Sequence, residues 1–401
     1  MKKEQTMIWN TSMKQHILYC AILIIVGCAN KAELGDNLTS ISSEYTIMNK
    51  PPGLAISVIK DGEVFWSYTH GYSDIAGKTT FDSKSIMNIG SVSKTITTTA
   101  ILQLWERGKL KLDTDIQQYV GFKVNNPNFK NTPITIEHLL THTSSISDSR
   151  AYSDSYQCGP PKVSLHDWLR NYFTPEGSYF DKTANFHPWE PGKDYKYSNV
   201  AYGLLGLIVE KVSAQPFDVY CENNILTPLK MNNSGWFRKD IDTLQQAKQY
   251  VFSAELEKKN PLAYKLVSKK IDNFHELCTY SFYNYPDGLF KTSIENLSRF
   301  MLAMMQGGKY GDQKILQTST VDKALSLQLK NNNIQGLGWK KINHENFSLW
   351  GHSGRDPGVR THMYFHLETN IGIILFQNND EGSTLKLIEK IYESIRKHEK
   401  Q

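Results

Sequence analysis

Segments that alternate between apolar and polar residues lie near both ends of this 401-residue chain, and they limit the folds that it can adopt. The stretch "GLAISVIKDGEVFWSYTHGY" contains two such segments joined by Asp61-Gly62, a dipeptide that suits the positive φ angles of a tight hairpin turn. Near the other end, "NFSLWGHSG", "VRTHMYFHLE" and "IGIILFQN" are three more strand-like runs. These segments predict one antiparallel sheet that is built from both ends of the chain.

The middle of the chain has a different pattern. From Thr95 to about Leu277 it contains helix starts, Pro-Gly turns and aromatic loops, with few alternating runs. The chain closes with apolar residues at helical spacing, at Leu385, Ile388, Ile391, Tyr392 and Ile395. We therefore expect an α/β (α+β) fold. Its sheet domain would occupy residues 45–92 and 280–398, a mostly helical domain residues 93–279, and a linker residues 29–44.

Composition excludes some functions. The net charge of +5 is small and the basic residues form no stripe, so we expect no nucleic-acid partner. The five cysteines include no C-x-x-C pair, which argues against a zinc cluster. His138 and His142 have a spacing that could bind zinc, but no third ligand follows at a recognisable spacing, so no metal site is predicted.

The N-terminus, residues 1–28, resembles an export signal. Lys14 and His16 precede an apolar run from Ile17 to Gly27, which is shorter than the roughly 20 residues that span a membrane. The run ends in "IVGC", which resembles the lipobox of bacterial lipoproteins, with Cys28 as the lipidated residue. The alternative is a signal peptide with an incidental cysteine. We expect an exported bacterial lipoprotein, periplasmic or anchored in the outer membrane.

A serine and a lysine are placed three residues apart in "NIGSVSKTITTTA". On a helix, Ser91 and Lys94 would share a face. A serine hydroxyl is a weak nucleophile unless a base removes its proton, and a lysine can do so where its surroundings keep the amine neutral. The pair therefore predicts an activated nucleophile and its base. The alternative is a helix-capping serine beside an exposed lysine.

Two later stretches favour the catalytic interpretation. Tyr197-Ser198-Asn199 stands directly before an apolar helix, where the Tyr197 phenol could relay protons and the Asn199 amide could bind substrate. We expect His352-Ser353-Gly354 to lie on an edge strand, where the glycine would let a substrate backbone approach closely.

In this order, the three stretches resemble the signatures of the serine β-lactamase and penicillin-binding DD-peptidase family. The likeness is to its class C-like branch, which includes D-alanyl-D-alanine carboxypeptidases, D-aminopeptidases and family VIII esterases. "ITIEHLLTHTSSI" and "PDGLFKTSIENLSRFMLAMMQGG" are also phrased as in that family, and the resemblance covers roughly residues 45–395. It implies a helical domain packed against a sheet flanked by helices, with the active site in the cleft between.

The resemblance also implies roles for individual residues. Ser91 would be the nucleophile, Lys94 its proton acceptor, and Tyr197 the relay that protonates the leaving group. Asn199 would hold the substrate amide, and His352, Ser353 and Gly354 would bind substrate. The backbone N–H groups of Ser91 and Arg355 would form the oxyanion hole. No metal or organic cofactor is implied.

The sequence leaves the substrate open. A DD-carboxypeptidase-like or other peptidase-like hydrolase, possibly acting on peptidoglycan peptides, a family VIII-type carboxylesterase and a class C-like β-lactamase share this set of residues. A non-catalytic penicillin-binding sensor is the alternative of another class.

Two departures from the family pattern affect the expected site. Ser145 replaces a turn glycine in "HTSS", and His352 replaces the lysine of most β-lactamases. We expect His352 to strengthen carboxylate recognition as the pH falls from about 8 to 6, because protonation gives the imidazole its charge. Arg355 or Arg360 would share this role if either turns into the cleft.

The lipobox generates the first prediction. If Cys28 carries lipid, the protein partitions into membranes, and Cys28→Ser releases it or blocks its processing. Intact-mass measurement of membrane-extracted protein checks this. An unmodified chain that begins after Cys28 would contradict it. The mature chain would keep Cys158, Cys221 and Cys278, enough for at most one disulfide.

Overall fold

The computed structural model describes residues 31–254, 256 and 261–400, so Cys28 and the predicted signal lie outside the described residues. The chain divides into two compact units, one of Pro51–Gly382 and one that includes the residues before Pro51 and after Gly382. Among the described helices, none is both long and apolar enough to cross a membrane.

The larger unit is built on a seven-stranded antiparallel sheet with strand order β13-β14-β15-β16-β1-β2-β3. Within this sheet the first strand of the chain, β1, pairs with the last, β16. The prediction that one sheet is built from both ends of the chain is therefore confirmed. The strands are β1 (Gly53–Lys60), β2 (Glu63–Asp74), β3 (Thr79–Thr80), β13 (Lys340–Asn343), β14 (Ser348–Asp356), β15 (Val359–His366) and β16 (Ile371–Gln377).

The predicted hairpin is also present. Asp61 and Gly62 have φ angles of 53° and 85°, in the left-handed region that a two-residue turn requires. A register shift follows Val58, so Trp66 lies opposite Val58, and Val64 lies opposite Ile59.

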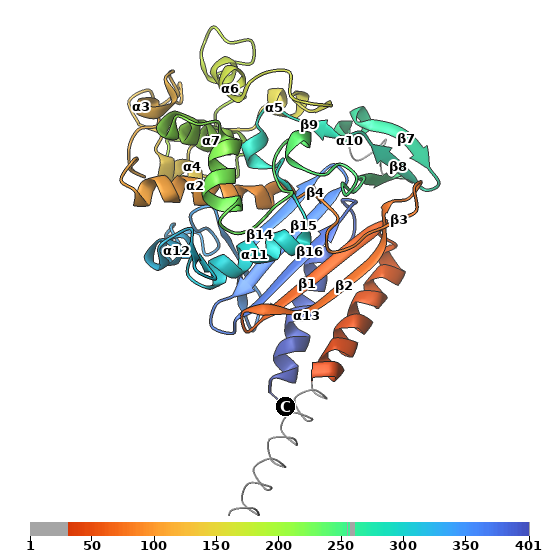
Figure 1. The fold of residues 1–401 in the computed structure, drawn as a ribbon. Coiled ribbons are helices and arrows are strands. Elements are labelled where there is room, and N and C mark those ends of the chain that lie inside the picture. The colour runs from red at the N-terminus through yellow and green to blue at the C-terminus, as the bar shows by residue number, and fades with distance from the viewer. Residues whose placement is uncertain (1–30, 255, 257–260, 401) are drawn as a thin grey trace, which may run out of the picture. The chain divides into compact units, whose positions relative to one another are not determined.

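One helix covers a face of this sheet (Figure 1). It is α11 (Ile294–Met305), and it packs very closely: a Cβ added to Gly372 of β16 would lie 2.6 Å from the Met301 Cε. The Ser57 and Ser298 hydroxyls lie 3.2 Å apart across the same contact. Met301 and Met304 are fully buried, so they are core residues.

The helices between β4 and α11 gather beside the sheet (Figure 1). Two of them, α2 and α7, are buried over most of their length and form the core of this region. Gly203 and Gly206 of α7 allow residues 284 and 286 to approach, because added Cβ atoms would lie 1.7 Å from Asn284 Oδ1 and 2.4 Å from Pro286 Cγ. This contact holds the turn at residues 284–288 against α7.

Other helices of the larger unit, in the part of the chain that the structure describes, are η1 (Gly90–Val92), α2 (Ser93–Glu106), α3 (Gln117–Val120), α4 (Ile136–Leu140), α5 (Arg150–Asp154), α6 (Leu165–Phe173), α7 (Val200–Ser213), α8 (Phe217–Cys221), η2 (Glu222–Leu226), η3 (Arg238–Asp240), α10 (Pro261–Lys265), η4 (Tyr285–Asp287) and α12 (Thr318–Ala324). Short strand pairs join β4 (Met87–Asn88) to β10 (Lys291–Thr292), β5 (Gln157–Cys158) to β9 (Tyr280–Ser281), and β11 (Lys309–Tyr310) to β12 (Gln313–Lys314).

The region expected to be mostly helical also contains a small sheet. β6 (Tyr250–Phe252), β8 (Phe274–Leu277) and β7 (Val267–Ile271) pair in that order. The strands are too short, and β7 too polar, for alternation to reveal them in the sequence.

The smaller unit corrects the expected linker over residues 29–44. Residues 31–49 form a helix, and α13 (Thr384–His398) is the predicted terminal helix. The Asn37 amide donates to the Ser394 hydroxyl at 3.2 Å. Leu34, Leu38 and Tyr45 are buried at helical spacing, but the polar residues between them hid this pattern in the sequence.

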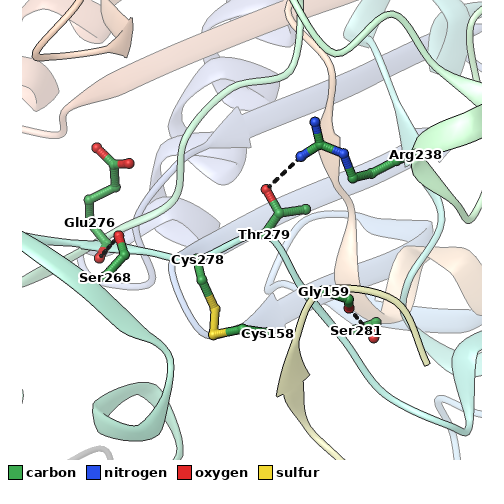
Figure 2. The surroundings of a disulfide bond; sticks show 8 residues. All are labelled: Cys158, Gly159, Arg238, Ser268, Glu276, Cys278, Thr279 and Ser281. Atoms are coloured by element: carbon green, nitrogen blue, oxygen red, sulfur yellow. Dashed lines mark hydrogen bonds between the residues drawn. A yellow bond between two sulfur atoms is a disulfide. The ribbon is translucent and has the colours of Figure 1, made fainter. Parts of the chain in front are cut away.

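A disulfide joins two parts of the larger unit that are far apart in sequence. Cys158 and Cys278 are bonded across 120 residues, next to the β5–β9 pair (Figure 2). The Ser281 hydroxyl donates to the Gly159 carbonyl at 2.5 Å beside the bridge. Cys221 is a free, buried cysteine.

We expect the disulfide to stabilise the fold, because closing so long a loop restricts the unfolded chain. The double variant Cys158→Ser/Cys278→Ser should lose about 2–4 kcal/mol of unfolding free energy, measured by urea denaturation. Reductant should lower the wild-type stability to the same level and leave the double variant unchanged. An effect of reductant on the double variant would contradict this.

Candidate active site

The serine and lysine of the first motif are in hydrogen-bonding contact. Ser91 lies in η1, directly before α2, and Lys94 is in the first turn of α2. The Lys94 Nζ lies 3.1 Å from the Ser91 Oγ. Two contacts hold the turn in place: Gly90 N donates to Asn88 Oδ1 at 2.7 Å, and the Ser93 hydroxyl donates to Gly90 O at 2.6 Å.

The Lys94 amine is fully buried and has further polar partners. It donates to Asn199 Oδ1 and to the Asp287 carbonyl, both at 2.8 Å. Burial lowers the pKa of Lys94, while the negative charges of Asp287, Asp148 and Asp356 oppose that shift. The site thus favours an amine that can lose its proton and accept one from Ser91.

The Tyr197–Asn199 segment is fixed by a carboxylate that the sequence did not reveal. Asp148 accepts hydrogen bonds from the Ser198 hydroxyl, from the backbone N–H groups of Asn199 and Val200, and from the Asn199 amide. These distances are 2.9–3.0 Å. A carboxylate at the first turn of α7 also suits the helix dipole. Both ends of the Asn199 side chain are engaged, one by Lys94 and one by Asp148, so its role in binding substrate stays a prediction.

Tyr197 has the environment of a proton relay. Its hydroxyl is buried, and it lies near the Ser91 hydroxyl. Burial raises the pKa of Tyr197 well above its usual value, while the Ser91 hydroxyl acts in the opposite direction. The phenol therefore holds its proton at neutral pH and can donate it to a leaving group.

The third motif lies directly against the first. A Cβ on Gly354 would lie 2.1 Å from the Ile89 carbonyl, so only glycine allows this approach. This differs from our expectation that the glycine makes room for substrate. The Arg355 N lies 3.0 Å from the position that a Cβ on Gly90 would take. The backbone groups of Ser91 and Arg355 are thus brought close together, as an oxyanion hole requires.

His352 does not have the charge that we expected. It is buried, and its Nδ1 donates to the Ser353 carbonyl at 2.7 Å. Burial holds the pKa of His352 well below its usual range, and the charges of Lys340 and Lys94 lower it further. The imidazole stays neutral between pH 6 and 8, so the expected pH dependence from His352 is wrong.

Ser353 is also engaged within the protein. Its hydroxyl lies 2.8 Å from both His362 Nδ1 and the Tyr364 hydroxyl. Burial lowers the pKa of His362 to about 3, so this imidazole is neutral too.

Residues from all three motifs line one pocket of about 720 Å³. Its wall also contains two buried carboxyl groups that the sequence did not predict. Asp287 accepts from the Tyr152 hydroxyl at 2.7 Å, and Asp356 accepts from the Tyr156 hydroxyl at 2.9 Å. Burial raises the pKa of Asp287 to about 7 and that of Asp356 to about 6.

The predicted site residues fall into two groups. Ser91, Tyr197, Asn199, His352, Ser353 and Arg355 line the pocket, with Lys94 and Gly354 behind them. Sequence reasoning missed Asp148, Asp287 and Lys340. Asp148 and Asp287 lie in turn-like stretches, and Lys340 follows a buried tryptophan, so no local pattern marks them as site residues.

Three residues that the sequence singled out have structural roles. His142 Nδ1 accepts from Ser198 N at 3.2 Å, and His138 Nδ1 accepts from Thr135 N at 3.3 Å. Ser145 adopts the left-handed conformation with φ of 59°, and its hydroxyl accepts from the Asn126 amide at 3.0 Å. Within the described ranges, no group of three or more His, Cys, Asp or Glu is placed to hold a metal ion.

Comparison with known families agrees with this arrangement. The family model described as Beta-lactamase matches residues 43–392. The chain therefore belongs to the Beta-lactamase family, whose enzymes are generally serine hydrolases.

Several individual proteins are similar to this chain. Protein flp of Staphylococcus aureus (strain MRSA252) is 27% identical over 350 residues, which cover 87% of this chain and 64% of the relative. The chain thus spans just under two thirds of that relative. Penicillin-binding protein 4* of Bacillus subtilis (strain 168) is 24% identical over 80% of this chain and 67% of its own length. The D-amino acid amidase of Ochrobactrum anthropi SV3 has the same fold, with a TM-score of 0.72 at 18% identity over 91% of this chain and 99% of its own.

Asp148 is a positioning residue whose removal can be tested. Asp148→Asn replaces one of the two acceptor oxygens by an amide donor and removes the charge, and each charge-assisted hydrogen bond contributes about 1.5–3 kcal/mol. We expect kcat/KM for an activated ester to fall about 10- to 100-fold. The loss of negative charge also lowers the pKa of Lys94. We expect kcat/KM to increase with pH as Lys94 loses its proton, and this increase should occur at lower pH in the variant.

The matched control is Asp154→Asn, which removes an exposed carboxylate paired with Arg150 and Lys265. It should leave the rate and the pH profile unchanged. A slower Asp148→Asn enzyme with an unshifted pH profile would show that Asp148 acts on folding alone.

Proposed function

We propose that this protein is a serine hydrolase that acts on amide or ester bonds through an acyl-enzyme on Ser91. We propose a DD-carboxypeptidase-like or related peptidase activity, with peptides that end in D-amino acids as the substrate class. The observation that carries the proposal is the 3.1 Å contact between the Ser91 hydroxyl and a buried Lys94 amine. Its support is the shared pocket, which also contains Tyr197 and His352.

Acylation would begin with attack of the Ser91 Oγ on the substrate carbonyl carbon. Lys94 accepts the hydroxyl proton, because burial lowers its pKa. The oxyanion is stabilised by the backbone N–H groups of Ser91 and Arg355. As the carbon–nitrogen or carbon–oxygen bond breaks, Tyr197 gives its proton to the leaving amine or alcohol and regains one from Lys94.

Deacylation would use the same groups in reverse. Water attacks the acyl carbon, Tyr197 and Lys94 remove its proton, and the bond to Ser91 Oγ breaks as that oxygen is protonated. The products are the carboxylic acid and free enzyme.

Export is part of the proposal. The Cys158–Cys278 disulfide supports it, because such bonds persist in oxidising compartments outside the cytosol. A lipid anchor at Cys28 would then hold the protein at a membrane.

Ser91→Ala tests the nucleophile. This change removes the atom that forms the acyl-enzyme, so hydrolysis of an activated thioester should fall at least about 1000-fold. Intact-mass measurement should show an acyl adduct on the wild-type protein and none on the variant. Hydrolysis at the wild-type rate by Ser91→Ala would overturn the proposal.

Ser93→Ala is the matched control, since the Ser93 hydroxyl is buried and bonded to Gly90 O and Phe290 N. This variant should still be acylated on Ser91. Incubation with a fluorescent penicillin distinguishes an enzyme from a sensor. If the label stays on the protein and no activated thioester or ester is hydrolysed, the protein is a non-catalytic penicillin-binding sensor.

A further inference from the structure

A carboxylate at the end of β14 is hydrogen-bonded to the side chain that holds the turn before Ser91. The Asn88 amide nitrogen donates to Asp356 at 3.0 Å, and the Gly90 N–H donates to the oxygen of the same amide at 2.7 Å. Both side chains belong to buried residues, with 3% of Asn88 and 8% of Asp356 exposed. Asp356 is thus connected to the Ser91 turn through one intervening side chain.

Asp356 determines which end of the Asn88 amide faces the turn. A carboxylate can only accept hydrogen bonds, so it binds the NH₂ end of the amide and leaves the amide oxygen directed at Gly90. The Tyr280 hydroxyl lies at the same NH₂ end, 3.2 Å from the nitrogen. Without the carboxylate, the amide can rotate and present its NH₂ group to the Gly90 N–H, and the turn then loses its acceptor.

The same carboxylate belongs to the strand that supplies the second oxyanion donor. Asp356 directly follows Arg355 in β14, and the Arg355 backbone nitrogen lies close to Gly90. The second oxygen of Asp356 accepts from the Tyr156 hydroxyl at 2.9 Å, so both carboxylate oxygens are held. The Gly90 and Ser91 N–H groups belong to adjacent planar peptide units, so fixing the first restricts the second. Asp356 therefore joins the two backbone segments that would bind the oxyanion.

We infer that Asp356 is a positioning residue for the oxyanion hole and that it acts through Asn88 on the peptide between Gly90 and Ser91. This inference rests on the proposed function and extends it to a residue outside the three motifs. Oxyanion donors stabilise the transition state more than the bound substrate, so a displaced donor lowers kcat and leaves KM nearly unchanged. Acylation and deacylation both form an oxyanion, so kcat falls whichever step is slower.

Asp356 can accept both hydrogen bonds at neutral pH. Burial raises the pKa of Asp356 to about 6, and hydrogen bonds from Tyr156 and Asn88 limit this rise. The carboxyl group is therefore an anion above that pH and takes up a proton below it. The titratable groups around it come from α2, the α5 segment, β9, η4 and β10: Lys94, Tyr152, Tyr156, Tyr280, Asp287 and Lys291.

The test exchanges the two side chains. Asp356→Asn removes the acceptor that orients the Asn88 amide, so kcat for an activated thioester should fall about 10- to 100-fold, with KM within about threefold. Asn88→Asp replaces the donor by a second carboxylate beside Asp356, and repulsion should cause a similar loss near pH 8. The double variant Asn88→Asp/Asp356→Asn reverses donor and acceptor and keeps an acceptor for Gly90. Its kcat should recover to within about threefold of the wild type.

Asn88→Asp also has a pH signature that a role in folding alone would not produce. Two facing carboxylates raise the pKa of one of them, and the proton that they then share restores a hydrogen bond between positions 88 and 356. The kcat of Asn88→Asp, divided by that of the wild type, should therefore increase as the pH falls from about 8 to about 6. The double variant has no carboxylate pair, so its ratio to the wild type should stay nearly constant.

Asp181→Asn is the matched control. Asp181 also accepts three hydrogen bonds, of 2.7–2.9 Å, but it is exposed and lies outside the lining of the active-site pocket. This variant should leave kcat unchanged at each pH.

A wild-type kcat in Asp356→Asn, or a loss in the double variant equal to the product of the two single losses, would overturn the inference. If a single variant fails to fold by circular dichroism, the double variant still decides: recovery of kcat supports the inference, and a lasting loss contradicts it.

Failure of the proposed function gives a different result. If the activated thioester does not acylate Ser91 in the wild-type protein by intact mass, the serine hydrolase proposal fails, and the inference fails with it. If Ser91 is acylated and turned over, and the exchange of residues 88 and 356 gives no recovery, only the positioning role of Asp356 is wrong.

Discussion

Burial of the Lys94 amine is the constraint on which the rest of the pocket depends. An amine removed from water must find hydrogen-bond partners, and Lys94 finds three, in Ser91, Asn199 and the Asp287 carbonyl. Each partner belongs to a different segment. The amine therefore fixes η1, the start of α7 and the turn at residues 284–288 with respect to one another. Catalytic geometry and the packing of the helical region are set by the same contacts.

Charge in this pocket is arranged by depth. Lys94 lies deepest and is opposed by the carboxyl groups of Asp148, Asp287 and Asp356, whose charges favour a protonated amine. Lys340 lies nearer the opening, without such a carboxylate partner among the described residues. The two lysines lie near the same tyrosine ring, 5.0 Å and 4.3 Å from its centre. Repulsion between them helps to lower the pKa of Lys340.

The sequence allowed the fold class, the pairing of chain ends in one sheet, and the three motifs to be predicted, because each depends on local spacing. Asp61-Gly62 and the Ser91–Lys94 pair are examples, since their geometry is set within a few residues. Asp148 and Lys340 could not be found in this way. Their places in the pocket arise from contacts between residues far apart in sequence, such as the hydrogen bond that the Asn199 amide donates to Asp148, 51 positions away. The state of His352 was mispredicted for the same reason: its pKa depends on burial and on two distant lysines.

The strand order has a consequence for how the protein is made. β1, the first strand to be synthesised, lies between β2 and β16, and β16 is the last strand of the sheet. The edge of β1 that pairs with β16 therefore stays unpaired until nearly all of the chain has been synthesised. Strand β14, which packs against Gly90, is also made late. Such distant pairing makes folding slow. The pocket therefore cannot form on a partly synthesised chain, because the turn that contains Ser91 and the strand that closes on it come from opposite ends of the sheet-forming sequence.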